Sequence, residues 1–157
     1  MRSVIRILLT LAVVTVSGWG GYLSMGQYQN DKFGFTVRYP GHIFTKKTLP
    51  DAGDGILFQG RDGLECRIYG SWFSESVRES YRNVLRWEQE AGSRITYKVL
   101  KRDWFVISGI HKGGRTLFYQ KTYFKKETSV TMRFLYRVKD KVRYDSLIPD
   151  MLEGLDF

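Results

Sequence analysis

The chain has one cysteine, two histidines and three prolines among its 157 residues. A single cysteine excludes an intrachain disulfide, and together with His42 and His111 it cannot form a closed zinc site without carboxylate ligands. Cys66 lies in an alternating strand pattern, which favours a small core residue over the alternative of a reactive thiol. The sequence also lacks a P-loop and a dinucleotide-binding glycine motif. We therefore predict no metal site and no cofactor.

The sequence also lacks the usual residue pattern of a hydrolytic active site. Asp103, Ser108 and His111 lie close together in the sequence, and a catalytic triad needs a base within hydrogen-bond reach of its nucleophile. Val106 and Ile107 precede Ser108 where a nucleophile elbow would carry a glycine. On a strand, Ser108 and His111 would also face opposite sides. We therefore predict no catalytic residue and no enzyme, with an exported hydrolase acting on an envelope substrate as the alternative.

Strand patterns dominate, and the strongest of them flanks a polar turn at 125–128. The arm after the turn alternates with period two, and its apolar register holds Val130, Met132, Phe134, Tyr136 and Val138. The arm before the turn has aromatic residues in both registers, with Phe118 and Phe124 in one and Tyr119 and Tyr123 in the other. We therefore predict a hairpin at the middle of an antiparallel sheet, with its first arm covered on both faces.

Two helical patterns interrupt the strands. Residues 74–91 repeat apolar positions at helical spacing, and Ser76 and Glu79 have the spacing of a capping box. Residues 144–155 repeat in the same way, but Pro149 predicts either a kink or a helix that starts near this proline. Further strands are predicted at 33–40, 56–59, 64–69, 95–101 and 104–110. This order predicts an α+β fold, an antiparallel sheet of six or seven strands packed with two helices.

An apolar leader helix is predicted to precede the domain. Arg2 and Arg6 give it a positive start, residues 7–16 are mostly apolar, and Gly18 and Gly20 offer small residues for cleavage, as in a secretory signal. The alternative is an uncleaved anchor at the short end of membrane-spanning lengths. The residues predicted to contact a membrane are Ile7, Leu8, Leu9, Leu11, Val13, Val14, Val16 and Trp19. Either way we predict an exported protein, periplasmic or anchored to the outer side of the cytoplasmic membrane.

Positive charge is the main feature that points to a partner. The net charge of +9 favours anionic partners. In the first predicted helix, arginines recur every four residues and form one stripe, and two more share the polar register of the last strand. Arginine suits carboxylate or phosphate groups, and tryptophan often anchors an interface. The predicted partner-binding residues are Arg78, Arg82, Arg86, Trp87, Arg133 and Arg137. A solvated helix face and sheet surface is the alternative.

Several local phrases resemble the PsbP-like family. Asn30 followed by FGFTVRYP at 33–40 is similar to the opening of these domains, and DG at 54–55, SG at 108–109 and FYQK at 118–121 add to the likeness. The fold is named for an extrinsic lumenal subunit of photosystem II and is shared with a eukaryotic Ran-binding import factor. The resemblance implies an α/β/α sandwich over about residues 30–157. It also implies a non-enzymatic binding or assembly role.

Together these observations predict a leader at 1–23, a linker at 24–32 and a single domain at 33–157. The predicted function is non-catalytic docking on an acidic protein or an anionic membrane surface, with a role as accessory subunit of a membrane complex as one form of it. Nucleic acid is not a predicted partner, because an exported chain is separated from the cytoplasm, where nucleic acid is usually found. The oligomeric state, the identity of the partner and the fate of the leader stay open.

Overall fold

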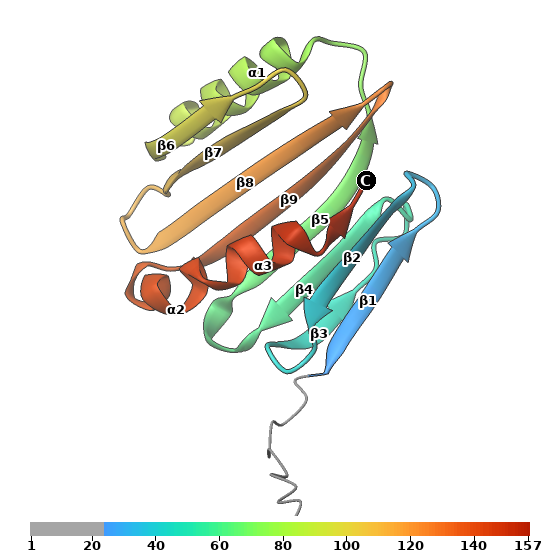
Figure 1. Cartoon of the computed structure of the whole chain (residues 1–157). Helices are drawn as coiled ribbons and strands as arrows, with labels where there is room; N and C mark the ends of the chain where they lie inside the picture. Colours follow the sequence, from blue (N-terminus) through green and yellow to red (C-terminus); the bar gives the residue numbers. More distant parts are fainter. Residues whose placement is uncertain (1–23) are drawn as a thin grey trace, which may run out of the picture.

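The structure, a computed structural model, describes residues 24–157, and its largest element is a seven-stranded antiparallel sheet (Figure 1). The strand order is β3-β4-β5-β9-β8-β7-β6. The strands are β3 (Phe44–Thr48), β4 (Gly55–Gly60), β5 (Glu65–Trp72), β6 (Arg94–Leu100), β7 (Trp104–Ile110), β8 (Thr116–Lys125) and β9 (Thr128–Arg137). The β8–β9 hairpin lies inside this sheet, so the predicted central hairpin and the predicted α+β class are confirmed.

A second, three-stranded sheet was not predicted. Its strands are β1 (Met25–Asn30), β2 (Phe35–Pro40) and β10 (Leu155–Asp156). The prediction of a linker at 24–32 is therefore wrong over β1, which pairs with β2 along its whole length. An edge strand needs few apolar residues, because one of its sides stays in solvent. Tyr28 ties β1 to the large sheet, since its hydroxyl donates a 3.0 Å hydrogen bond to the carbonyl oxygen of Gly55.

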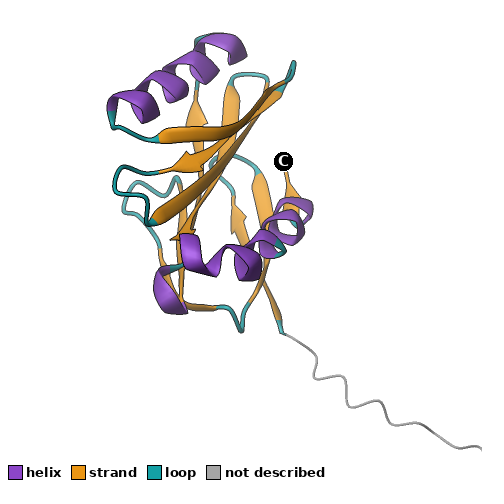
Figure 2. Ribbon diagram, turned by 90° about the vertical axis from the view of Figure 1, so that its left-hand side faces the viewer, coloured by secondary structure: helices purple, strands orange, loops and turns teal. Residues whose placement is uncertain are grey.

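Helices cover both faces of the large sheet (Figure 2). α1 (Val77–Glu90) packs on one face of β6, β7 and β8, while α2 (Lys141–Asp145) and α3 (Leu147–Glu153) lie on the other side. The predicted C-terminal helix is thus two helices that meet at Ser146. Pro149 occupies the third position of α3, where a missing N–H costs no intrahelical hydrogen bond.

The core is split by the sheet into two clusters. The larger one joins Met132 and Phe134 of β9 to Phe35 of β2 and Met151 of α3, all of them at most 1% exposed. The smaller one, between α1 and the sheet, contains Phe105, Ile107 and Phe118. Alternating side chains of β8 and β9 therefore face two different layers, as the period-two pattern requires.

No helix within residues 24–157 is both long and apolar enough to cross a membrane. The predicted leader at 1–23, with its membrane-contacting residues from Ile7 to Trp19, lies outside the residues that the structure describes. Signal peptide and anchor therefore both stay predictions.

Candidate docking surface

The outward face of α1 carries the arginine stripe. A capping box starts the helix as predicted: the Glu79 amide donates to Ser76 Oγ at 3.2 Å, and the Ser76 amide donates to Glu79 Oε2 at 2.9 Å. The inward positions pack against the smaller core cluster, and they are Val77, Tyr81, Val84 and Leu85. This packing fixes the rotation of the helix, so Arg78, Arg82 and Arg86 all stay exposed on its outer side.

The positive charges of these three arginines are little compensated by acidic side chains of the described residues. The guanidinium of Arg86 donates to Asn83 Oδ1 at 2.7 Å. Glu79 interacts electrostatically with Arg82, but its carboxylate is engaged in the capping box. Within residues 24–157, none of the three forms an ion pair shorter than 4.0 Å. We call Arg78, Arg82 and Arg86 the α1 stripe.

Trp87 lies next to the stripe in sequence and is 66% exposed. A large aromatic side chain in solvent beside arginines is typical of an interface anchor. The sequence prediction placed Trp87 among the partner-binding residues, and the structure leaves its ring accessible.

Arg133 belongs to a different environment from the one predicted. It lies 2.7 Å from the carboxylate of Glu88, and its guanidinium also donates to Gln120 Oε1 at 2.7 Å. Glu88 is the buried residue of α1 and accepts a 2.8 Å hydrogen bond from Ser93 Oγ. Arg133 therefore anchors α1 to β9 and is not a free contact on the sheet surface.

Arg137 is likewise engaged. Its Nε donates to Asp140 at 2.6 Å, and its Nη2 lies 3.2 Å from Asp62 in the turn between β4 and β5. Asp62 also pairs with Arg143 at 3.1 Å. The hydrogen bond to Asp140 raises the pKa of Arg137. The structure thus brings together only part of the predicted set, namely the α1 stripe and Trp87.

The hydrolytic candidates do not form a triad. Ser108 Oγ donates to the carbonyl oxygen of Phe118 at 2.8 Å, an ordinary side-chain to strand contact. The ring of His111 stacks on Phe118 at a centroid distance of 5.1 Å and lies 3.3 Å from Arg133. Burial lowers the pKa of His111, although Glu88 acts in the opposite direction. In residues 24–157, no hydrogen bond joins Ser108 to His111 or His111 to Asp103.

Cys66 is fully buried, as the core prediction requires, and burial raises the pKa of its thiol well above the usual value. No group of three or more histidine, cysteine or acidic side chains in the described part of the chain is arranged to hold a metal ion.

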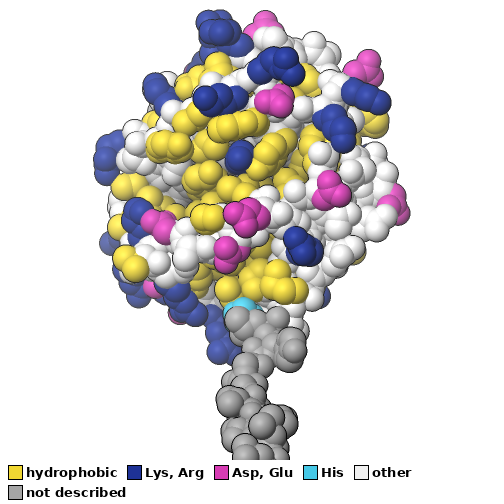
Figure 3. All heavy atoms as spheres, viewed as in Figure 1, with side chains coloured by type: hydrophobic (Ala, Val, Ile, Leu, Met, Phe, Trp, Pro, Cys, Tyr) yellow, Lys and Arg dark blue, Asp and Glu magenta, His cyan; other side chains and the backbone are white. Residues whose placement is uncertain are grey.

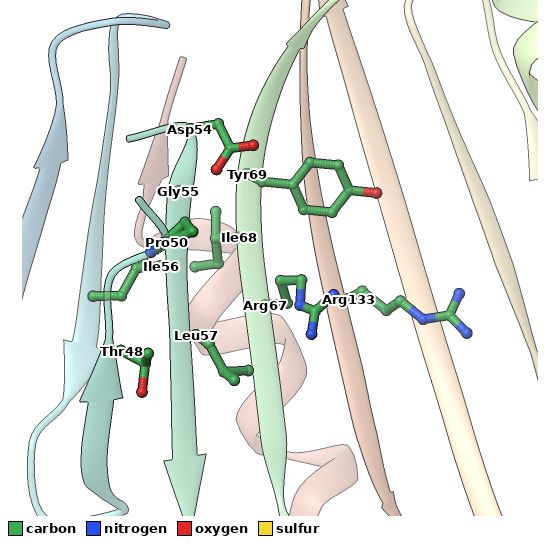
Figure 4. A pocket seen from close by; sticks show the side chains of 10 residues that line it. All are labelled: Thr48, Pro50, Asp54, Gly55, Ile56, Leu57, Arg67, Ile68, Tyr69 and Arg133. Atoms are coloured by element: carbon green, nitrogen blue, oxygen red, sulfur yellow. The ribbon is translucent and has the colours of Figure 1, made fainter. Parts of the chain in front are cut away.

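A shallow pocket of about 510 Å³ lies on the large sheet near the start of β4 (Figure 4). It is lined by Asp54, Arg67, Tyr69 and Arg133 together with apolar residues of β4 and β5. In Figure 4 the labelled side chains of Arg133 and Tyr69 point away from Asp54, so these polar groups do not converge on one point. We therefore assign no chemistry to this pocket.

Comparison with known proteins identifies the fold alone. No family model matches the chain, and no curated protein matches it in sequence. The solution structure of cyanobacterial PsbP (CyanoP) from Synechocystis sp. PCC 6803 matches with a TM-score of 0.66 at 11% identity, over 91% of this chain and 98% of that one. The predicted PsbP-like fold is thereby confirmed.

Proposed function

We propose that this chain is a non-catalytic binding protein that docks on an anionic surface through the α1 stripe. The observation that carries the proposal is the alignment of Arg78, Arg82 and Arg86 on the exposed side of one helix, without an acidic ion-pair partner in residues 24–157. Guanidinium groups one helical turn apart suit a row of carboxylates or phosphates. Trp87 adds an accessible aromatic contact beside them.

Two further observations and one prediction support a docking role over a catalytic one. The candidate hydrolytic residues make structural contacts. The fold resembles that of PsbP, and the resemblance to its family implies accessory or assembly functions. The predicted leader would place the domain outside the cytoplasm, where an acidic membrane protein or an anionic bilayer is available. An accessory subunit of a membrane complex is the form of this function that we favour.

Charge reversal on α1 tests the proposal. The variant is Arg82→Glu with Arg86→Glu in the full chain, and its matched control is Lys46→Glu with Lys139→Glu, which changes the same charge at two exposed positions away from α1. Binding is measured to isolated envelope membranes and to vesicles with and without phosphatidylglycerol, at low and moderate salt.

The α1 variant should bind more weakly by roughly thirtyfold, if each reversal removes about 0.5 kcal/mol of attraction and adds a similar repulsion. The control should bind nearly as well as the parent chain. Binding should also weaken as salt rises, because exposed charges are screened beyond about 10 Å at roughly 0.1 M salt. Equal binding of the α1 variant and its control would remove the stripe from the function.

A further inference from the structure

The strands covered by α1 present a second face, which is only partly covered. Neighbours across β7 and β8 share a face, so Trp104 lies beside Tyr123 and Val106 beside Lys121. Tyr97 of β6 joins them, because it pairs with Ser108 on the same side. The residues of the opposite register, such as Phe105 and Phe118, point into the cluster under α1. We call Tyr97, Trp104, Tyr119, Lys121 and Tyr123 the aromatic face.

The fold covers this face only in part, because Trp104, Tyr119, Lys121 and Tyr123 are half-buried and Tyr97 is exposed. Figure 3 shows hydrophobic side chains gathered over β6, β7 and β8, in front of the sheet and above α3. Tyr97 is 54% exposed, and Tyr119 touches the larger core cluster at its border. We predicted that β8 is covered on both faces. This prediction is confirmed for the face under α1, but the opposite face is only partly covered at Tyr123. A pocket of about 260 Å³ lies at one end of the face, and Asp103 and Lys125 line it together with Tyr123 and Phe157.

A single cation lies within the aromatic face. The ammonium of Lys121 is 4.4 Å from the ring centroid of Trp104 and 4.6 Å from that of Tyr123. Burial lowers the pKa of Lys121, raises that of Tyr123 and raises that of Tyr119 to about 12, so the phenols stay neutral at physiological pH. Within residues 24–157, no carboxylate forms an ion pair with Lys121.

We propose that the aromatic face is a docking site for a partner protein whose contacting segment presents a carboxylate among apolar side chains, and that this carboxylate pairs with Lys121. Charge complementarity favours such a segment, because the five residues of the aromatic face include one cation, Lys121, and no carboxylate, and Lys121 forms no ion pair within residues 24–157. Tyrosine and tryptophan are enriched in protein interfaces, and partly buried charged pairs there contribute more than exposed ones. The site lies on the opposite side of β6–β8 from the α1 stripe.

Two other occupants fit the face less well. A second copy of this chain would bring together two molecules of net charge +9, which repel each other. A flat bilayer would meet α3 and β10, which lie beside the aromatic face on the same side of the sheet (Figures 1 and 2). A protruding protein segment can reach past these elements.

Site-specific photo-crosslinking in the cells that make the full chain tests this proposal. The photoreactive residue p-benzoylphenylalanine replaces Tyr97, which is exposed enough to accept it, and in a parallel chain it replaces Trp87 on α1. Each chain is made with Lys121 intact, with Lys121→Met and with Lys121→Arg. Methionine keeps the apolar stem of the side chain without its charge, and arginine keeps the charge. Thermal melting of each variant shows that it is folded.

Position 97 should form an adduct with a protein, mapped by mass spectrometry to a segment that holds Asp or Glu between apolar residues. Lys121→Met should reduce its yield by roughly tenfold, the effect of losing one charge-assisted hydrogen bond, while Lys121→Arg should retain most of it. Adducts with lipid or with a second copy of the chain, absence of any adduct, or a yield that ignores Lys121→Met would overturn the proposal. If the chain labelled at position 97 forms its adduct but the chain labelled at position 87 forms none, the result would instead count against docking by the α1 stripe.

Discussion

Removing Arg133 should destabilise the fold more than removing any surface arginine. Arg133 is the partner of Glu88, whose side chain is only 11% exposed, and the Arg133 side chain itself is 21% exposed. The guanidinium also lies 4.9 Å from the ring centroid of Phe118. Breaking a buried pair by deleting one partner leaves a charge without compensation and costs about 3–5 kcal/mol. Because the pair is not fully buried, we expect the lower end, about 3 kcal/mol, for Arg133→Met.

Urea unfolding of the full chain, followed by circular dichroism, measures this cost. Adding Glu88→Gln to Arg133→Met should recover about 2 kcal/mol, because the neutral amide no longer leaves an unpaired charge under α1. Arg137→Met is the matched control, since the Arg137 side chain is 38% exposed and that of its partner Asp62 is 44% exposed, so this pair is more exposed than the pair of Arg133 and Glu88. The control should cost less than about 1 kcal/mol. A similar cost for the two single variants, or no recovery in the double variant, would refute the anchoring role of Arg133.

Two further predictions concern titratable groups. Folded protein should resist labelling of Cys66 by a thiol reagent at neutral pH and react fully in urea, because the thiol is buried and its pKa is raised; rapid labelling of the folded chain would contradict a core position. Glu79 has a pKa lowered in the folded state by its hydrogen bonds to Ser76, so its stabilisation is present above its ordinary pKa of about 4.5 and is lost as pH falls below that value. Melting temperatures should therefore fall less on acidification in Glu79→Gln than in the parent chain, and parallel curves for the two chains would argue against this capping role.

The elements with strong local signals could be predicted from sequence. The capping box of α1 and the alternation of β9 depend on neighbouring residues, and both appear in the structure as expected. β3 has no such signal, because Phe44 is its only buried residue and its remaining residues are exposed. β1 was missed for the same reason. An edge strand is defined by its backbone pairing with a single neighbouring strand, β2 for β1 and β4 for β3, and it can form with few apolar residues of its own.

Periodicity alone could not show whether the arginines of β9 form internal ion pairs or belong to a docking surface. Arg133 and Arg137 share the polar face of β9, where alternation says only that they point away from the apolar layer. Their ion pairs involve Glu88 of α1 and Asp62 of the turn before β5, so they depend on tertiary contacts. The α1 stripe was predictable because the helix buries its opposite face locally, whatever sheet it packs against.

The aromatic face could not be predicted from the sequence either, because it also depends on tertiary contacts. Aromatic residues in both registers of β8 indicate a strand with cover on two sides, but the pattern cannot say whether the second cover comes from this chain or from another. In the structure α1 covers Phe118, whereas Tyr123 lies beside the ammonium of Lys121, which pairs with no carboxylate of residues 24–157. The two surfaces of β6–β8 therefore differ in physical character. Salt screens the exposed α1 stripe strongly, while Lys121, partly shielded by aromatic rings, keeps more of its attraction for a carboxylate. We therefore propose that the chain holds an anionic surface reversibly on one side and a protein partner more persistently on the other.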